Sequence, residues 1–387
     1  MLNIADTLHG WCRQARPFAL ATVIQVSGSA PLSPGTSLAV NADGEAVGSV
    51  SGGCVEGAVY ELCTQVLQDD GPPARARFGY SDDDAFAVGL TCGGEIDVLV
   101  QRVEPTDQPH LTAALDEVTH GRPAAVAQVV DGHEDLIGRT LSLLGDGSTY
   151  DGTLGSENED RAVVARARAH LRAGRTAVVD AGGDPDTCPA KLTVLVHVQA
   201  APPRMLIFGA VDFAAALSQA ASFLGYRVTV CDARPVFATA ARFPHADEVV
   251  VDWPHRYLAA TDVDARTVVC VLTHDPKFDI PLLTLALSLP VAYIGAMGSR
   301  RTHEDRNRRL RETGVTTAQL TRLNSPIGLD LGAHTPEETA ISITAEIIAH
   351  THQATGLPLS HGTGPIHRSD STGPIPARSA RSARSAV

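Results

Sequence analysis

From residue 204 to about residue 352, short apolar runs alternate with segments of helical spacing, and this alternation restricts the fold more than any other feature of the chain. Buried strands are expected at 205–208, 227–231, 249–251, 268–272 and 291–294, with helices between them such as 214–224. Strands that are joined through helices pair in parallel, and the helices then cover both faces of the sheet. The sequence therefore predicts a Rossmann-like domain over residues 202–352. Its last helix should begin at Thr335, with a capping box that Glu338 completes.

The chain before this domain has a different organisation. Residues 1–105 alternate apolar strands, at 18–26, 37–40, 46–50 and 95–100, with glycine-rich turns and a helix at 55–67, which predicts an α+β domain with glycine loops. Residues 106–201 predict a second α+β segment, with helices near 109–119 and 161–173 and a strand at 192–198, and we assign no chemistry to it. Residues 353–387 are rich in Gly, Pro, Ser and Arg, so they predict a disordered tail that cannot bury a core. The fold class is α/β overall.

Composition excludes several classes of function. The formal net charge of -13 argues against nucleic acid as a partner, because such proteins need basic surfaces to displace counterions from phosphate. No apolar run approaches the ~20 residues of a membrane span. The first residues lack the basic start and apolar core of a secretory signal, so we expect a cytoplasmic protein. The seven cysteines form no C-x-x-C pair and no H-E-x-x-H occurs, which argues against both a disulfide framework and zinc.

Two glycine loops carry cysteines. The first runs from residue 48 to residue 56, follows a strand and opens a helix, and we expect its ligand contacts to come from Ser51, Gly52, Gly53, Cys54 and Glu56. A helix N-terminus attracts anions and favours the thiolate of a nearby cysteine. The second loop places Cys92, Gly93 and Gly94 just before the strand that starts at residue 95. A tight turn with a buried cysteine is the alternative for each loop. Their presence in one small domain, with a third small-residue loop at 28–31, favours a shared pocket.

Two further glycine turns lie in the Rossmann-like domain. Gly209 and Ala210 follow its first strand, and Asp232 and Arg234 come about 20 residues later, which is the spacing of a dinucleotide site. The fingerprint is incomplete, because Val211 stands where a second glycine would let the backbone approach a pyrophosphate.

The other turn contains Gly298, Ser299 and Arg300, followed by Arg301. Arginines at a helix start oppose the helix dipole, so a bound anion would explain them. Ion pairs with Glu304 and Asp305 in the same helix are the alternative.

Together these segments resemble the XdhC/CoxI family. The N-terminal signature is similar to G-S-A-P at 28–31, G-S-V-S-G-G-C-V-E at 48–56 and T-C-G-G at 91–94. The C-terminal signature is similar to I-F-G-A at 207–210, D-A-R at 232–234, T-H-D at 273–275, I-G with G-S-R at 294–300 and I-G-L-D-L-G-A at 327–333. Two departures stand out: Leu32 replaces a frequent Arg, and residues 211–213 replace the usual Gly-His.

The resemblance implies an accessory protein that is not itself a metabolic enzyme. Such a protein binds the molybdenum cofactor (molybdopterin, as the mononucleotide or as the cytosine dinucleotide), protects it, assists its sulfuration and hands it to an apo molybdenum hydroxylase of the xanthine or carbon monoxide dehydrogenase type. Cys54 and Cys92 then become the residues expected to contact the cofactor and its molybdenum. A cysteine desulfurase is a further partner that the resemblance allows, and we expect a homo-oligomer.

Two other functions stay open at the level of sequence. One is an NAD(P)-dependent oxidoreductase that uses the Rossmann-like domain. The other is a thiol-dependent sulfur-transfer enzyme in which Cys54 carries a persulfide.

Overall fold

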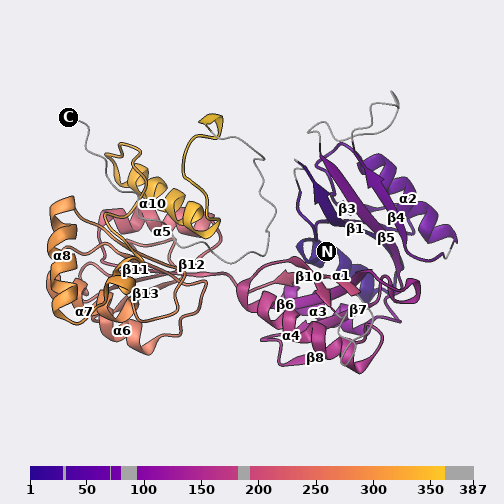
Figure 1. Cartoon of the computed structure of the whole chain (residues 1–387), viewed down its shortest axis with the longest axis horizontal. Coiled ribbons are helices and arrows are strands. Elements are labelled where there is room, and N and C mark those ends of the chain that lie inside the picture. The colour runs from indigo at the N-terminus through magenta and orange to yellow at the C-terminus, as the bar shows by residue number, and fades with distance from the viewer. Residues whose placement is uncertain (29–31, 70, 80–93, 182–191, 362–387) are drawn as a thin grey trace.

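A computed structural model describes residues 1–28, 32–69, 71–79, 94–181 and 192–361. The chain forms two lobes that the segment around residue 202 connects (Figure 1). The N-terminal lobe is residues 1–201, and the C-terminal lobe is residues 202–361. No helix in the described ranges is long and apolar enough to cross a membrane.

The described part of residues 1–105 forms a five-stranded antiparallel sheet in the order β3-β2-β1-β5-β4. Along β1, residues alternate between the two faces, as the strand period of two requires. Ala19, Ala21 and Val23 pack under α2, whereas Phe18 and Leu20 pack against α1 and α3. The elements of this part are α1 (Ala5–Arg13), β1 (Phe18–Ser27), β2 (Ser37–Asn41), β3 (Ala46–Gly48), α2 (Glu56–Asp69), β4 (Ala74–Phe78) and β5 (Glu95–Val103).

The described part of residues 106–201 forms a second five-stranded antiparallel sheet, in the order β8-β7-β6-β10-β9. Helix α4 covers one face, and the other face packs toward the first sheet. Ala124 and Val126 of β6 belong to the same apolar cluster as Phe18, so residues 1–105 and 106–201 share a core. The elements here are α3 (Pro109–Thr119), β6 (Ala124–Asp131), β7 (Thr140–Leu144), β8 (Thr149–Gly152), α4 (Glu157–Ala173), β9 (Ala177–Ala181) and β10 (Leu192–Gln199).

The C-terminal lobe contains a six-stranded parallel sheet in the order β13-β12-β11-β14-β15-β16. Helices α5 and α10 cover one face, and α6, α7 and α8 cover the other (Figure 1). The strand order reverses between β11 and β14, and open sheets of this kind bind ligands outside the carboxyl ends of the strands at such a point. The elements are β11 (Arg204–Phe208), α5 (Asp212–Phe223), β12 (Arg227–Asp232), β13 (Glu248–Val251), α6 (Pro254–Ala260), β14 (Val268–Val271), α7 (Pro276–Ala286), β15 (Tyr293–Ala296), α8 (Arg300–Glu312), α9 (Thr317–Leu320), β16 (Leu323–Asn324) and α10 (Pro336–Thr351).

The predicted fold class is confirmed, and the capping box of Thr335 and Glu338 forms as expected. Some boundaries differ. Strand β15 begins at Tyr293 instead of residue 291, and β3 ends at Gly48 because the following loop turns away from the sheet. The strands β4, β6, β7, β8, β9 and β16 were not anticipated. The predicted domain boundaries remain predictions, and most of the predicted tail, residues 362–387, lies outside the described residues.

Candidate functional site

Three glycine segments lie toward the same end of the first sheet, where β1 and β3 finish and β5 begins. Gly28 follows the end of β1, and the register pairs Ser27 with Glu95, so the residues before β5 lie beside it. Strand β3 ends at Gly48, which pairs with Leu38 near the start of β2, so the loop after β3 extends toward the same edge. Gly48 has φ +88°, and a Cβ there would lie 2.2 Å from the carbonyl oxygen of Ser37, so only glycine fits.

The loop between β3 and α2 folds around the carboxylate of Glu56. This carboxylate accepts backbone N–H bonds from Val50 (3.2 Å), Ser51 (2.9 Å), Gly53 (2.8 Å) and Val55 (3.2 Å). It also accepts hydroxyl bonds from Ser49 and Ser51, each of 2.6 Å. Partial burial opposes ionisation of Glu56, but the bonds from Ser49 and Ser51 prevail and lower its pKa to about 2. Of the residues expected to contact a ligand, Ser51 and Gly53 therefore direct their N–H groups at Glu56, and Gly52 directs its N–H at Ser49 Oγ (3.0 Å).

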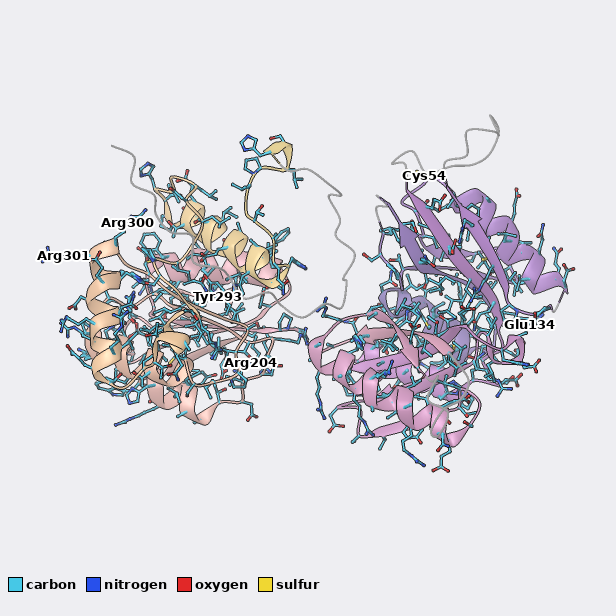
Figure 2. The ribbon with its side chains drawn as sticks, viewed as in Figure 1. Cys54, Glu134, Arg204, Tyr293, Arg300 and Arg301 are labelled. Atoms are coloured by element: carbon cyan, nitrogen blue, oxygen red, sulfur yellow. The ribbon has the colours of Figure 1, made fainter. Side chains whose placement is uncertain are left out.

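Ser51 connects this carboxylate to Cys54. The Ser51 side chain is buried, and its hydroxyl accepts N–H bonds from Cys54 and Val55, both of 3.0 Å, while it donates to Glu56. Cys54 is half-buried, near the top of the N-terminal lobe in the view of Figure 2. Helix α2 begins at Glu56, one residue after the predicted start at residue 55, so Cys54 lies two residues before the helix.

The second cysteine loop is described only in part. Gly94 is buried directly before β5, whereas Cys92 and Gly93 lie outside the described residues. The sheet register brings Gly94 to the same edge as the loop of Cys54. The predicted pocket shared by Cys54 and Cys92 stays a prediction.

In the first turn of the parallel sheet, the groups that could bind a dinucleotide are hydrogen-bonded to one another. Gly209 has φ +111°, and a Cβ there would lie 2.9 Å from the Thr273 side chain. The N–H of Ala210 donates to Asp232 Oδ2 at 2.7 Å, and Arg234 donates to both carboxylate oxygens of Asp232 through its side chain. Burial of Asp232 opposes ionisation, but the bonds from Arg234 and Ala210 lower its pKa. The acid at the expected ribose-binding position is therefore already engaged within the chain.

The turn after β15 has an exposed, basic end. Ser299 caps α8 by accepting the N–H of Thr302 at 3.1 Å, and Gly298 adopts φ +149° beside it. Arg300 and Arg301 are exposed at the outer end of the C-terminal lobe (Figure 2). Asp305, an expected partner of these arginines, instead pairs with two arginines further along α8, Arg308 and Arg309.

A buried ion pair that sequence reasoning missed joins the loops at the carboxyl edge of the parallel sheet. Arg306 and Asp279 are both nearly inaccessible and lie 3.1 Å apart. Arg306 also donates to Ser325 Oγ at 2.9 Å and to the carbonyl of Met297 at 2.8 Å, and Thr273 donates to Asp279. Only the T-H-D segment at 273–275 hinted at this cluster in the sequence, because Arg306 looks like one more surface arginine of α8.

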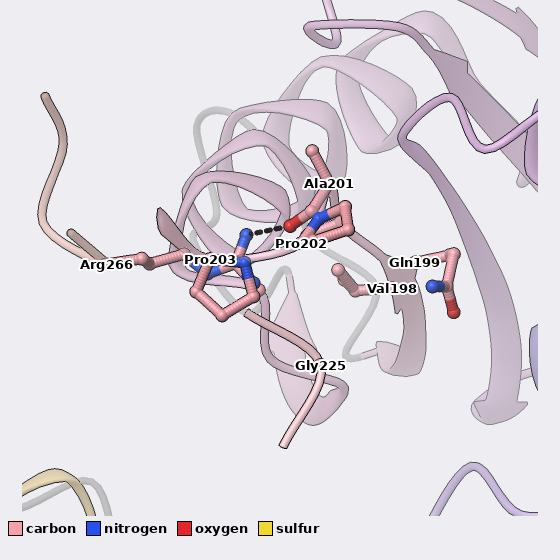
Figure 3. Close-up of a pocket in the computed structure, with 9 residues that line it drawn as sticks. Val198, Gln199, Ala201, Pro202, Pro203, Gly225 and Arg266 are labelled. Atoms are coloured by element: carbon pink, nitrogen blue, oxygen red, sulfur yellow. Dashed lines mark hydrogen bonds between the residues drawn. The ribbon is translucent and has the colours of Figure 1, made fainter. Parts of the chain in front are cut away.

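Cys54 and Arg300 lie in different lobes, Cys54 in the N-terminal lobe and Arg300 in the C-terminal lobe (Figure 2). A pocket of about 280 Å³ does occur where the lobes join, lined by Gly174, Val198, Gln199, Ala200, Ala201, Pro202, Pro203, Gly225 and Arg266. Arg266 donates to the carbonyl of Ala201 at 2.8 Å across it (Figure 3). This lining includes none of the predicted site residues. The described ranges also hold no cluster of three or more His, Cys, Asp or Glu side chains suited to a metal ion.

Comparisons with known proteins place these features in a family. The XdhC Rossmann domain matches residues 205–347, and the XdhC and CoxI family matches residues 11–79. The chain is 27% identical to a probable xanthine dehydrogenase subunit from Bacillus subtilis (strain 168), over 90% of this chain and 97% of that protein. It is 25% identical to the molybdenum cofactor insertion chaperone PaoD of Escherichia coli (strain K12), over 88% of this chain and 86% of PaoD.

A solved structure is similar to this chain over most of its length. The crystal structure of a xanthine dehydrogenase from Bacillus halodurans matches with a TM-score of 0.63 and 27% identity, over 91% of this chain and 96% of that chain. The two matched family ranges together cover more than half of the sequence, and they fall on the two lobes that the structure separates. The chain belongs to the XdhC and CoxI family.

Proposed function

We propose that this protein is a maturation factor that binds the molybdenum cofactor as cargo and delivers it to an apo molybdenum hydroxylase. The support comes from its family and from a full-length relative that is named as a molybdenum cofactor insertion chaperone. We further propose that it assists sulfuration of the cofactor before delivery, with a cysteine desulfurase as the sulfur source. In this proposal the cargo is the pterin as the mononucleotide or as the cytosine dinucleotide. The proposal also includes that the protein assembles as a homo-oligomer.

The observation that carries the proposal is the position of Cys54. The other described cysteines, Cys12, Cys63, Cys231 and Cys270, are buried in apolar clusters, whereas Cys54 is only half-buried, at the border of such a cluster on the loop before α2. Burial raises the pKa of Cys63 to about 12, so that thiol stays protonated at neutral pH. A thiolate is a soft ligand that suits molybdenum and sulfur chemistry, so Cys54 is the described thiol best placed to contact the cargo. Cys92 is proposed as its counterpart.

The geometry argues against an NAD(P)-dependent oxidoreductase. The Asp232 carboxylate already accepts hydrogen bonds from Ala210 and Arg234. Val211, the N-cap residue of α5, carries a branched side chain where a second glycine would let the backbone approach a pyrophosphate. A sulfur-transfer enzyme with Cys54 as the sulfur carrier is the remaining alternative. Such an enzyme would transfer sulfur over many turnovers without a client, whereas a cargo carrier would not.

Substitution of Cys54 tests the proposal. Cys54→Ser keeps the size of the side chain and removes the soft ligand, so folding should persist while pterin no longer copurifies. A client hydroxylase produced alongside this variant should accumulate without its cofactor or terminal sulfur. Cys63→Ala is the matched control, because it removes a buried thiol of the same sheet-and-helix unit and should leave cofactor capture unchanged.

Three measurements separate the alternatives: the absorption spectrum of the purified protein, the cofactor content of the client and the activity of the client. Full client activity and undiminished pterin binding with Cys54→Ser would remove Cys54 from the proposal. Multiple-turnover sulfur transfer by the purified protein, without any client, would favour the enzyme alternative.

A further inference from the structure

The loop from residue 49 to residue 55 has the construction of an anion site, and its anion is part of the chain. Six donors converge on the carboxylate of Glu56: four backbone N–H groups and the hydroxyls of Ser49 and Ser51. Backbone N–H groups that converge in this way ahead of a helix commonly bind phosphate or sulfate. In this loop, the position of such a ligand is taken by the first residue of α2.

We infer that Glu56 is the built-in occupant of this anion site and thereby a positioning residue for Cys54. The carboxylate prevents an external phosphate from entering the loop, and the bonds through Ser51 fix the backbone that carries the thiol. The loop then offers a ligand its sulfur instead of its N–H groups. The occupancy of the site stands on the geometry alone, whereas the consequence for cofactor capture rests on the proposed function.

The chemistry of the side chain explains why a glutamate is required. An ionised carboxylate only accepts hydrogen bonds, so its two oxygens satisfy donors from all sides. Glutamine at this position would direct an amide NH2 group at N–H donors and leave some of them without a partner. Loss of Glu56 also frees the hydroxyl of Ser51, which accepts from the N–H groups of Cys54 and Val55.

Chemical rescue tests this assignment. Glu56→Ala empties the site but keeps its donors, so formate or acetate should bind there and restore the loop. We expect the melting temperature of this variant to fall by roughly 5–10 °C, because six charge-assisted hydrogen bonds at a partly buried carboxylate are lost. We also expect the alkylation rate of Cys54, followed by peptide mass spectrometry, to rise several-fold. Millimolar formate should reverse both changes, whereas chloride at equal ionic strength should not.

Two control variants make the rescue specific. Glu56→Gln fills the same space without charge, so it should be destabilised but insensitive to formate. Glu61→Ala removes an exposed carboxylate from the same helix and should behave like the wild type with and without formate. A Glu56→Ala protein whose stability and Cys54 alkylation match the wild type, or do not respond to formate, overturns the inference.

A measurement on the wild type keeps the inference testable if Glu56→Ala does not fold. Carbon-13 NMR of the glutamate carboxylates should find one that titrates near the pKa of about 2 given by the hydrogen bonds of the loop. Millimolar phosphate should leave its signal and the loop amide signals unchanged. Phosphate-dependent shifts of the amides of residues 50–55 in the wild type would mean that the site is open and would refute the assignment. Because these measurements involve no cofactor, their results are independent of the outcome for Cys54→Ser.

Discussion

Removing Arg306 should destabilise the C-terminal lobe more than removing any surface arginine of α8. The side chain is 3% exposed, pairs with Asp279 at 3.1 Å and donates to Ser325 and to the carbonyl of Met297. Arg306→Met keeps the apolar stem and leaves the Asp279 carboxylate buried without its cation. Breaking a buried pair in this way costs about 3–5 kcal/mol. For a domain of this size, that corresponds to a fall in melting temperature of about 10 °C.

Differential scanning calorimetry of the full chain measures this effect, and two variants serve as references. Arg308→Met breaks ion pairs with Asp305 and Glu312 at the solvent-exposed surface of the same helix, so it should cost less than about 1 kcal/mol. The double variant Arg306→Met with Asp279→Leu replaces the pair by apolar groups and should recover at least half of the loss, since no unpaired charge remains. If Arg306→Met unfolds at the temperature of Arg308→Met, the buried pair does not stabilise the lobe and the reasoning fails.

Two further predictions concern a glycine within strand β15 and the first turn of the same sheet. Gly295→Ala should lower the free energy of unfolding by about 1–3 kcal/mol in denaturant titration, because the new Cβ would lie 2.4 Å from Ile327 Cδ1. Gly10→Ala is the control and should be neutral or mildly stabilising, because a Cβ there meets nothing within 4 Å. Equal effects of the two substitutions would contradict this reasoning. Isothermal titration calorimetry should find no low-micromolar affinity of the chain for NAD or NADP. Val211→Gly should not create one, because the Asp232 carboxylate remains bonded to Ala210 and Arg234. Tight binding by either protein would show that these bonds break to admit a ligand.

The parallel sheet could be predicted because its signals are local. Each strand of the C-terminal lobe is a short apolar run between helical segments, and the cap of α10 is written in Thr335, Pro336 and Glu338. The strands of residues 106–201 were mostly missed. Their pairing joins both neighbouring and distant segments, since Gln128 of β6 pairs with Thr140 of the next strand and with Leu195 of β10. Likewise, no pattern in either segment alone predicts the apolar core that residues 1–105 share with residues 106–201.

The candidate site divides in the same way. The sequence alone located the glycine loops, and it showed that Val211 interrupts the dinucleotide fingerprint. Only the tertiary structure decided which group each loop binds. A carboxylate from Glu56 or Asp232 and a phosphate from a ligand satisfy the same N–H donors, so the local pattern is identical in both cases. The difference depends on where the carboxylate is directed. Glu56 folds back over the loop that precedes it, and Asp232 reaches the N–H of Ala210 because β12 pairs with β11.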